Sequence, residues 1–225
     1  MNASQIIAKL KAMRNEKNIK GMARFGINTN CTIGVPIPFL VDIARSEKKN
    51  HSLALELWDS GIHEAKILAA LIDDPEKVSE KQMEKWVKDF DSWDVCDQVC
   101  MRLFDKKPFS YRKAVEWSAR KEEFVKRAGF ALIATLSVHD KKATDKDFEK
   151  FFPIIKREAT DERNFVRKAV NWALRQIGKR NKRLNKRAIA VAKQILKENA
   201  QSKSARWIAK DALRELEEKR KKLFA

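Results

Sequence analysis

Apolar residues recur along most of this chain at three- and four-residue spacings, the period of a helix with one buried face. Val166, Ala169, Val170, Ala173 and Ile177 form one such stripe. Strand-like alternation is absent throughout. The stripes and their breaks predict helices over residues 4–17, 39–48, 52–59, 63–72, 79–87, 91–104, 110–119, 121–137, 145–157, 162–179, 184–198 and 203–223. Residues 18–36, rich in Gly and Asn, are predicted to form the one long loop.

One segment, residues 91–100, places a carboxylate beside the core. Ser92 is a favourable N-cap, so Trp93 and Asp97 lie four residues apart on one helical face. Cys96 and Cys100 belong to the apolar stripe of the same helix, next to Asp97. A carboxylate in such a place is either paired with Lys or Arg or used in chemistry, and these ten residues alone favour a structural pair.

Short internal matches indicate a repeat. Phe-Val-Lys-Arg-Ala at 124–128 recurs as Phe-Val-Arg-Lys-Ala at 165–169, and Ala-Leu-Arg at 173–175 recurs at 212–214. The offsets lie near the period of about 40 residues that is typical of HEAT and armadillo helix pairs. We therefore expect an all-α superhelical solenoid of about six HEAT-like helix pairs, with residues 1–225 as a single domain.

The charge is large and unevenly distributed. The 225 residues carry a formal net charge of +18, and residues 151–225 hold 22 Lys and Arg against 8 Asp and Glu, a net +14. A solubilising surface could explain such an excess, but its size and location favour a polyanionic partner, above all nucleic acid. No apolar run reaches the roughly 20 residues of a membrane span. Three cysteines and the absence of a signal-peptide pattern favour the cytoplasm, in association with the nucleoid.

Candidate contact residues lie on the 162–179 helix. Trp172 falls at the rim of its apolar stripe, where the ring could meet nucleic acid or lie over the next repeat. Arg127 occupies the equivalent edge one repeat earlier and could hold a phosphate or pair with a carboxylate such as Asp97. The basic residues expected to contact DNA are Arg163, Arg167, Lys168, Arg175, Lys179 and Arg180.

Other chemistry is weakly represented. The other helical tryptophans, expected to be packing residues, are Trp58, Trp86, Trp117 and Trp207. His51, His63 and His139 have no spacing with cysteines that would make a zinc site, and Cys96 and Cys100 are expected to be buried thiols. We expect neither a metal nor an organic cofactor.

Four segments together resemble the AlkD-type DNA alkylation repair glycosylases, which are built from HEAT-like repeats. The segments are Leu57–Ala69, Trp93–Asp97, Phe124–Ala128 and Phe165–Arg175. The resemblance implies a catalytic cleft formed by Trp93, Asp97, Arg127 and Trp172. It also implies removal of N3- or N7-alkylated purines from duplex DNA without base flipping.

Within that resemblance, each residue type suits a role. The alkylated purine is cationic and departs as a neutral base, so the protein has to stabilise positive charge on the sugar. Asp97 would do this and position water, the two indoles would add cation–π stabilisation, and Arg127 would hold a phosphate. We expect a monomer acting on alkylated double-stranded DNA. Two alternatives stay open: a non-catalytic HEAT-repeat protein that binds branched or damaged DNA, and a solenoid that binds acidic proteins.

Overall fold

A computed structural model describes the backbone of residues 1–223 and the side chains of residues 1–218, and the described chain is helical without strands. It divides into two compact units, Met1–Lys107 and Pro108–Ala225. The prediction that residues 1–225 form one domain stays a prediction. None of the described helices has the length and apolar character needed to cross a membrane.

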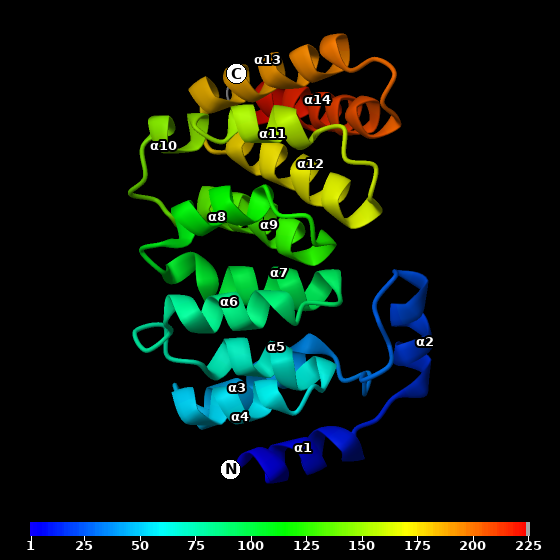
Figure 1. The fold of residues 1–225 in the computed structure, drawn as a ribbon, viewed down its shortest axis with the longest axis vertical. Helices are drawn as coiled ribbons and strands as arrows, with labels where there is room; N and C mark the ends of the chain where they lie inside the picture. The colour runs from blue at the N-terminus through cyan, green and yellow to red at the C-terminus, as the bar shows by residue number, and fades with distance from the viewer. Residues whose placement is uncertain (224–225) are drawn as a thin grey trace. The chain divides into compact units, whose positions relative to one another are not determined.

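The first unit contains the helices coloured from blue to green in Figure 1. They are α1 (Ala3–Ala12), α2 (Glu16–Arg24), α3 (Ile37–Glu47), α4 (His51–Asp59), α5 (His63–Ile72), α6 (Glu80–Lys88), α7 (Trp93–Arg102) and the 3-10 turn η1 (Phe104–Lys106). α5 packs against α3, α4 and α7 and is buried over most of its length.

Two tryptophans join α4 to α6 in the first unit. The rings of Trp58 and Trp86 stack in parallel with their centroids 3.9 Å apart. The indole nitrogen of Trp58 donates a hydrogen bond to Asp89 over 2.9 Å, so its polar atom is satisfied inside the core. Phe90 and Phe104 pack around this pair and extend the aromatic cluster.

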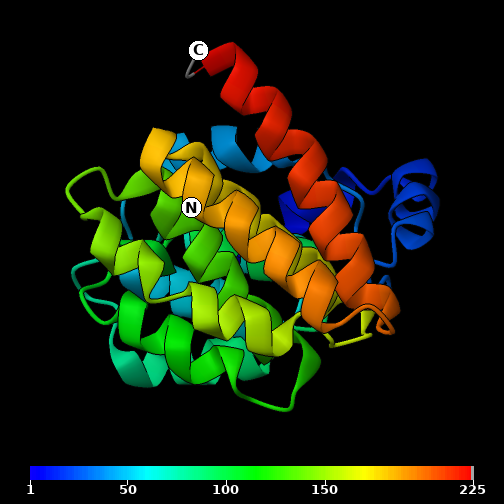
Figure 2. The same ribbon diagram turned by 90° about the horizontal axis from the view of Figure 1, so that it is seen from above.

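The second unit contains α8 (Ser110–Ser118), α9 (Glu123–His139), α10 (Asp145–Glu149), α11 (Phe152–Glu158), α12 (Asn164–Lys179), α13 (Lys182–Glu198) and α14 (Lys203–Leu223). α8, α11 and α13 contact one another in series and form one layer, and α9, α12 and α14 form the other. α13 and α14 pair at the end of the chain, as Figure 2 shows from above. This arrangement of stacked helix pairs is the one expected from the repeat.

Most predicted helices are present within a few residues of their expected ends, but the N-terminal region differs. The single helix expected over 4–17 is two helices, and the expected loop over 18–36 begins with a helix, so both predictions were wrong in part. Asn15 caps α2 by accepting a hydrogen bond from the Asn18 amide over 3.0 Å. α2 then continues through Gly21, because one glycine costs only about 1 kcal/mol in a helix.

The helix expected over 145–157 is also interrupted, into α10 and α11. Pro153 stands in the first turn of α11. A proline there has no amide hydrogen to donate and its ring clashes with the carbonyl four residues earlier, so the helix cannot run through. Pro153 is visible in the sequence, but the apolar spacing on either side of it led to the prediction of one continuous helix.

Candidate functional site

Trp93 and Asp97 lie on α7 in the first unit, as their spacing predicted. Both side chains are half-buried, whereas Val95, Cys96, Val99 and Cys100 are fully buried on the inner side of the helix. Asp97 therefore stands at the boundary between the core and the surface, one turn along from the indole. The indole nitrogen of Trp93 donates to the carbonyl oxygen of Phe25 over 3.0 Å, which fixes the plane of the ring.

The start of α7 is tied to the loop that follows α2. Ser92 is the N-cap residue, as predicted, but its hydroxyl accepts a hydrogen bond from the Asn28 amide over 3.1 Å. The Asn28 side chain donates to Asp91 over 2.8 Å. The loop therefore supports the turn from which Trp93 projects.

α5 supplies two further polar groups to this region, His63 and Glu64. Sequence reasoning considered His63 only as a possible zinc ligand and assigned no role to Glu64. His63 Nε2 is paired with Asp94 over 2.8 Å, and both side chains are nearly buried. Burial lowers the pKa of His63, but the hydrogen bond to Asp94 and the negative charges of Asp94 and Glu64 outweigh it and raise the pKa above its usual value. The pair fixes the first turn of α7 against α5.

Glu64 binds the other end of the loop. Its buried carboxylate accepts hydrogen bonds from the amides of Ile33, Gly34 and Val35 over 2.9, 2.5 and 3.3 Å. Three amide donors satisfy a carboxylate that would otherwise be costly to bury. Gly34 has a φ of +85°, and a Cβ there would lie 2.5 Å from the Asn15 carbonyl oxygen, so glycine is required.

Arg127 and Trp172 lie in the second unit, on the packed helices α9 and α12. Arg127 is only 5% exposed, and Nη1 donates to the carbonyl oxygen of Phe165 over 2.7 Å at the start of α12. Trp172 is half-buried and follows Phe165 by seven residues, so it lies on the same side of α12 about 10 Å further along.

The basic residues expected to contact DNA differ in their surroundings. Lys168 is exposed. Arg163 is paired with Asp161 over 2.6 Å, and Arg175 and Lys179 are both paired with Glu215. These contacts neutralise part of the positive charge of α12.

Arg180 joins α12 to the end of α9. Its guanidinium donates to the carbonyl oxygens of Ser137 and Ala143 over 2.8 and 3.1 Å and lies 4.2 Å from the centre of the Phe148 ring. These contacts give Arg180 a structural role within the second unit.

The tryptophans predicted to be packing residues fall into two groups. Trp58, Trp86 and Trp117 are buried, which confirms the prediction. Trp207 is 37% exposed, so the prediction was wrong for this residue.

The two thiols of α7 are buried, as predicted. Burial raises the pKa of Cys100, which keeps it a thiol rather than a nucleophilic thiolate. Within the described residues, no group of three or more His, Cys, Asp or Glu side chains could hold a metal ion.

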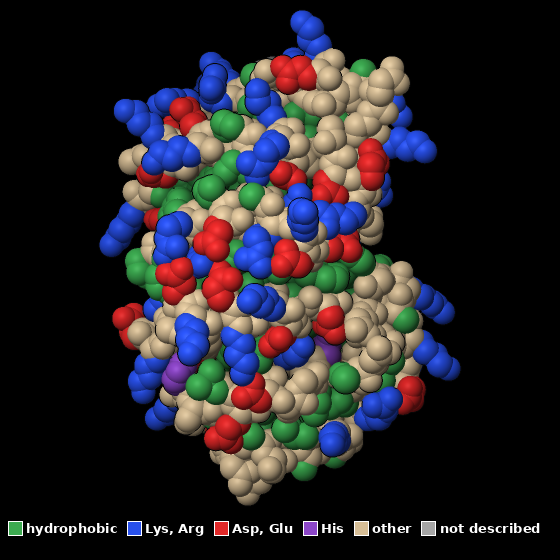
Figure 3. Space-filling model, viewed as in Figure 1, with side chains coloured by type: hydrophobic (Ala, Val, Ile, Leu, Met, Phe, Trp, Pro, Cys, Tyr) green, Lys and Arg blue, Asp and Glu red, His purple; other side chains and the backbone are tan. Residues whose placement is uncertain are grey.

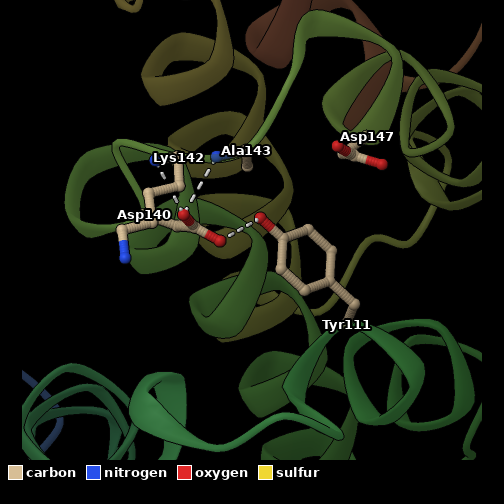
Figure 4. A pocket seen from close by; sticks show the side chains of 5 residues that line it. All are labelled: Tyr111, Asp140, Lys142, Ala143 and Asp147. Carbon is tan, nitrogen blue, oxygen red and sulfur yellow. Dashed lines mark hydrogen bonds between the residues drawn. The ribbon is translucent and has the colours of Figure 1, made fainter.

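A pocket of about 290 Å³ lies elsewhere in the second unit, lined by Tyr111, Asp140, Lys142, Ala143 and Asp147. Figure 4 shows the Tyr111 hydroxyl donating to Asp140 over 3.0 Å. Burial, then this hydrogen bond, raises the pKa of Tyr111, so it remains a neutral donor. Two carboxylates line the pocket, which makes it a poor site for a phosphate.

The fold and these residues define an all-α protein of HEAT-like repeats. The sequence profile of the DNA alkylation repair enzymes matches residues 6–216, so the chain belongs to that family, as the resemblance predicted. An uncharacterized protein of Listeria innocua is 27% identical over 195 residues, which are 85% of each chain.

A solved structure confirms the predicted all-α, HEAT-like fold class. It matches with a TM-score of 0.77 at 22% identity, over 86% of this chain and 83% of that chain. That protein is described as one of a new family related to the HEAT-like repeat DNA glycosylases with affinity for branched DNA structures.

Proposed function

We propose that this protein is a DNA glycosylase that hydrolyses the N-glycosidic bond of purines alkylated at N3 or N7 in double-stranded DNA. The single observation that carries the proposal is the placement of Trp93 and Asp97 one turn apart on α7, where a half-buried carboxylate stands near an indole that is hydrogen-bonded to the Phe25 carbonyl. Membership of the DNA alkylation repair enzyme family supports it.

The proposed reaction does not require protonation of the leaving group. Alkylation at N3 or N7 gives the purine a positive charge, so the base departs neutral and needs no general acid. The bond electrons go to the purine, and positive charge develops on the deoxyribose. A negative group beside C1′ stabilises that charge far better in a partly desolvated site than in bulk water.

Each proposed residue has a role that fits its surroundings. Asp97 stabilises the sugar cation and holds the attacking water, whose proton it accepts. Trp93 lies against the sugar and adds cation–π stabilisation. In the second unit, the half-buried Trp172 offers an aromatic face on α12 to the DNA. Arg127, a buried cation held by the Phe165 carbonyl, adds to the positive field of the second unit that attracts the DNA backbone.

The exposed basic residues supply affinity for DNA. Lys168 is the exposed member of the predicted DNA-contacting set, and it makes no ion pair with a described acidic side chain. Arg167 and Arg180 make none either, but both are half-buried and held by contacts within the second unit. We propose that Lys168 binds the duplex backbone, while Arg163, Arg175 and Lys179 contribute through the field that remains around their ion pairs.

Substitution of Asp97 tests the proposal. Asp97→Asn should lower the single-turnover rate of 7-methylguanine release from methylated duplex DNA by about 100-fold or more, because an amide cannot stabilise the sugar cation. DNA affinity should change by less than about threefold, because the residue does not contact phosphates.

Asp59→Asn is the matched control, since it removes the same charge from an exposed surface pair with Lys85. It should leave the rate unchanged. Equal rates for Asp97→Asn and wild type would exclude Asp97 as the catalytic carboxylate.

A second candidate function is non-catalytic binding of branched or damaged DNA. The affinity for branched DNA ascribed to the structural neighbour favours it. This alternative predicts tight, salt-sensitive binding, no formation of abasic sites, and indifference to Asp97→Asn. The base-release assay therefore separates the two functions.

A further inference from the structure

The last helix, α14, carries basic side chains on either side of an exposed indole. Lys203, Trp207, Lys210 and Arg214 are all exposed. At 3.6 residues per turn, their spacing places them within about 60° of one another around the helix and along about 16 Å of its axis. They form one continuous surface, which we call the Trp207 strip.

The same order of residue types occurs on α12, in Lys168, Trp172, Arg175 and Lys179. There, however, two of the three basic side chains are paired with α14: Arg175 and Lys179 both contact Glu215. The hydrogen bonds from Lys179 and Arg175 outweigh the effect of burial and lower the pKa of Glu215, so this carboxylate stays charged.

The Trp207 strip retains more of its charge. Lys203 and Lys210 form no ion pair with a described side chain, and Arg214 is paired with Asp211 on the same helix. Lys and Arg side chains are spread over this end of the second unit in the view of Figure 3. Of these two sets of side chains, the one on α14 therefore keeps more of its positive charge beside an exposed indole.

Trp207 is held in place by α12. The guanidinium of Arg167 lies 5.3 Å from the centre of the indole ring, and its Nη2 donates to Asn164 over 3.2 Å. Arg167 Nε is buried without a hydrogen-bond partner among the described residues, so the side chain is positioned by the ring more than by polar contacts. An indole that is supported by Arg167 and is still 37% exposed offers a flat, preorganised surface to a partner.

We propose that the Trp207 strip binds a single-stranded segment of DNA, with an unpaired base stacked on Trp207 and phosphates on Lys203, Lys210 and Arg214. In a duplex the faces of the bases are covered by their neighbours, so an indole outside the grooves has nothing to stack on. An unpaired base offers both faces. At about 3.4 Å per stacked nucleotide, the strip spans roughly five nucleotides.

This proposal rests on the proposed function only in requiring DNA as the ligand. It assigns different residues to a different part of the DNA, next to the duplex rather than at the lesion. The chain of residues 1–225 is tested by fluorescence anisotropy on a blunt duplex and on the same duplex carrying a single-stranded arm.

Trp207→Ala should weaken binding to the armed DNA by about 5- to 100-fold, the effect of losing one stacked base. It should change binding to the blunt duplex by less than about twofold. Trp207→Tyr keeps an aromatic face and should bind the armed DNA within about threefold of wild type. Phe39→Ala is the matched control, because it removes a ring that is 50% exposed on α3, and it should affect neither DNA.

The charge contribution has its own pair of variants. Lys210→Glu lies on the strip and Lys81→Glu lies on the exposed surface of α6, so both change the net charge equally. Lys210→Glu should weaken binding to the armed DNA by a factor at least about three times that of Lys81→Glu. Equal losses for the two variants would reduce the strip to a general electrostatic effect and overturn the proposal.

The proposal is also overturned if Trp207→Ala binds the armed DNA as wild type does, or loses affinity for both DNAs by the same factor. Base release from methylated duplex is measured in parallel, and Trp207→Ala should retain it. If Trp207→Ala does not weaken binding to the armed DNA while base release is intact, only the proposal for the Trp207 strip is excluded. If wild type releases no base while Trp207→Ala still weakens binding to the armed DNA, only the proposed glycosylase function is excluded.

Discussion

Asp94 and Asp97 lie within one turn of α7 and show two uses of a carboxylate. Asp94 is held by His63, and this pair has a structural role. Asp97 stands beside Trp93 at the edge of the core, where we propose that it acts on the sugar. Sequence spacing predicted the neighbours of Asp97 along its own helix. It could not predict the partner of Asp94, because His63 lies on another helix and is brought near only by the packing of α5 on α7.

The His63–Asp94 pair makes stability depend on pH. The pKa of His63 is raised in the folded protein, so protonated His63 is stabilised more in the folded protein than in the unfolded chain. Its stabilisation is complete below the usual pKa of about 6.5 and is lost as the pH rises through the folded pKa.

We therefore expect wild type to exceed His63→Gln in free energy of unfolding by more at pH 6 than at pH 9. Denaturant titrations at the two pH values measure this, and subtraction of the variant removes the contribution of groups that both proteins share. A difference that grows with pH would contradict the assigned role of His63.

Helix–helix contacts explain which parts of the fold were visible in the sequence. Each amphipathic stripe identified its own helix, because burial of one face is a local pattern. The division at Asn15 and the break at Pro153 were missed because their signals were weaker than the apolar spacing around them. The loop held by Glu64 could not be predicted, since its partners are backbone amides about 30 residues away.

Close approach of α8 and α9 depends on a glycine. A Cβ at Gly129 would lie 2.4 Å from the Ser118 amide nitrogen and 2.9 Å from the Ala114 carbonyl oxygen, both backbone atoms of α8. Gly129→Ala should lower the free energy of unfolding by about 1–3 kcal/mol, because the two helices must separate.

Gly21→Ala provides the contrast on α2. No atom lies within 4 Å of the position that its Cβ would take. This substitution should be neutral or stabilising by up to about 1 kcal/mol, since alanine favours the helix. Denaturant unfolding of both variants measures the difference. Equal effects would show that α8 and α9 do not require a glycine at their contact.

At the scale of the whole molecule, the uneven charge is the feature that links fold to function. The net +18 of the chain resides mainly in residues 151–225, which build the last helices of the second unit. The sequence contains this excess and predicts a polyanionic partner. It could not predict which cations are free, because the pairing of Arg175 and Lys179 with Glu215 depends on the packing of α12 against α14.

We propose that the protein removes bases whose positive charge makes them good leaving groups. Wild-type protein should release 7-methylguanine from duplex DNA at a rate well above that of spontaneous depurination. It should not accelerate the loss of unmodified guanine from the same duplex, because that base is neutral and no general acid is assigned to protonate it.

The most direct test is a single-turnover assay in which both bases are measured by chromatography in one reaction. We expect release of 7-methylguanine alone. Absence of accelerated release of either base, under conditions where the protein is bound to the DNA, would contradict it and leave a DNA-binding protein without glycosylase activity.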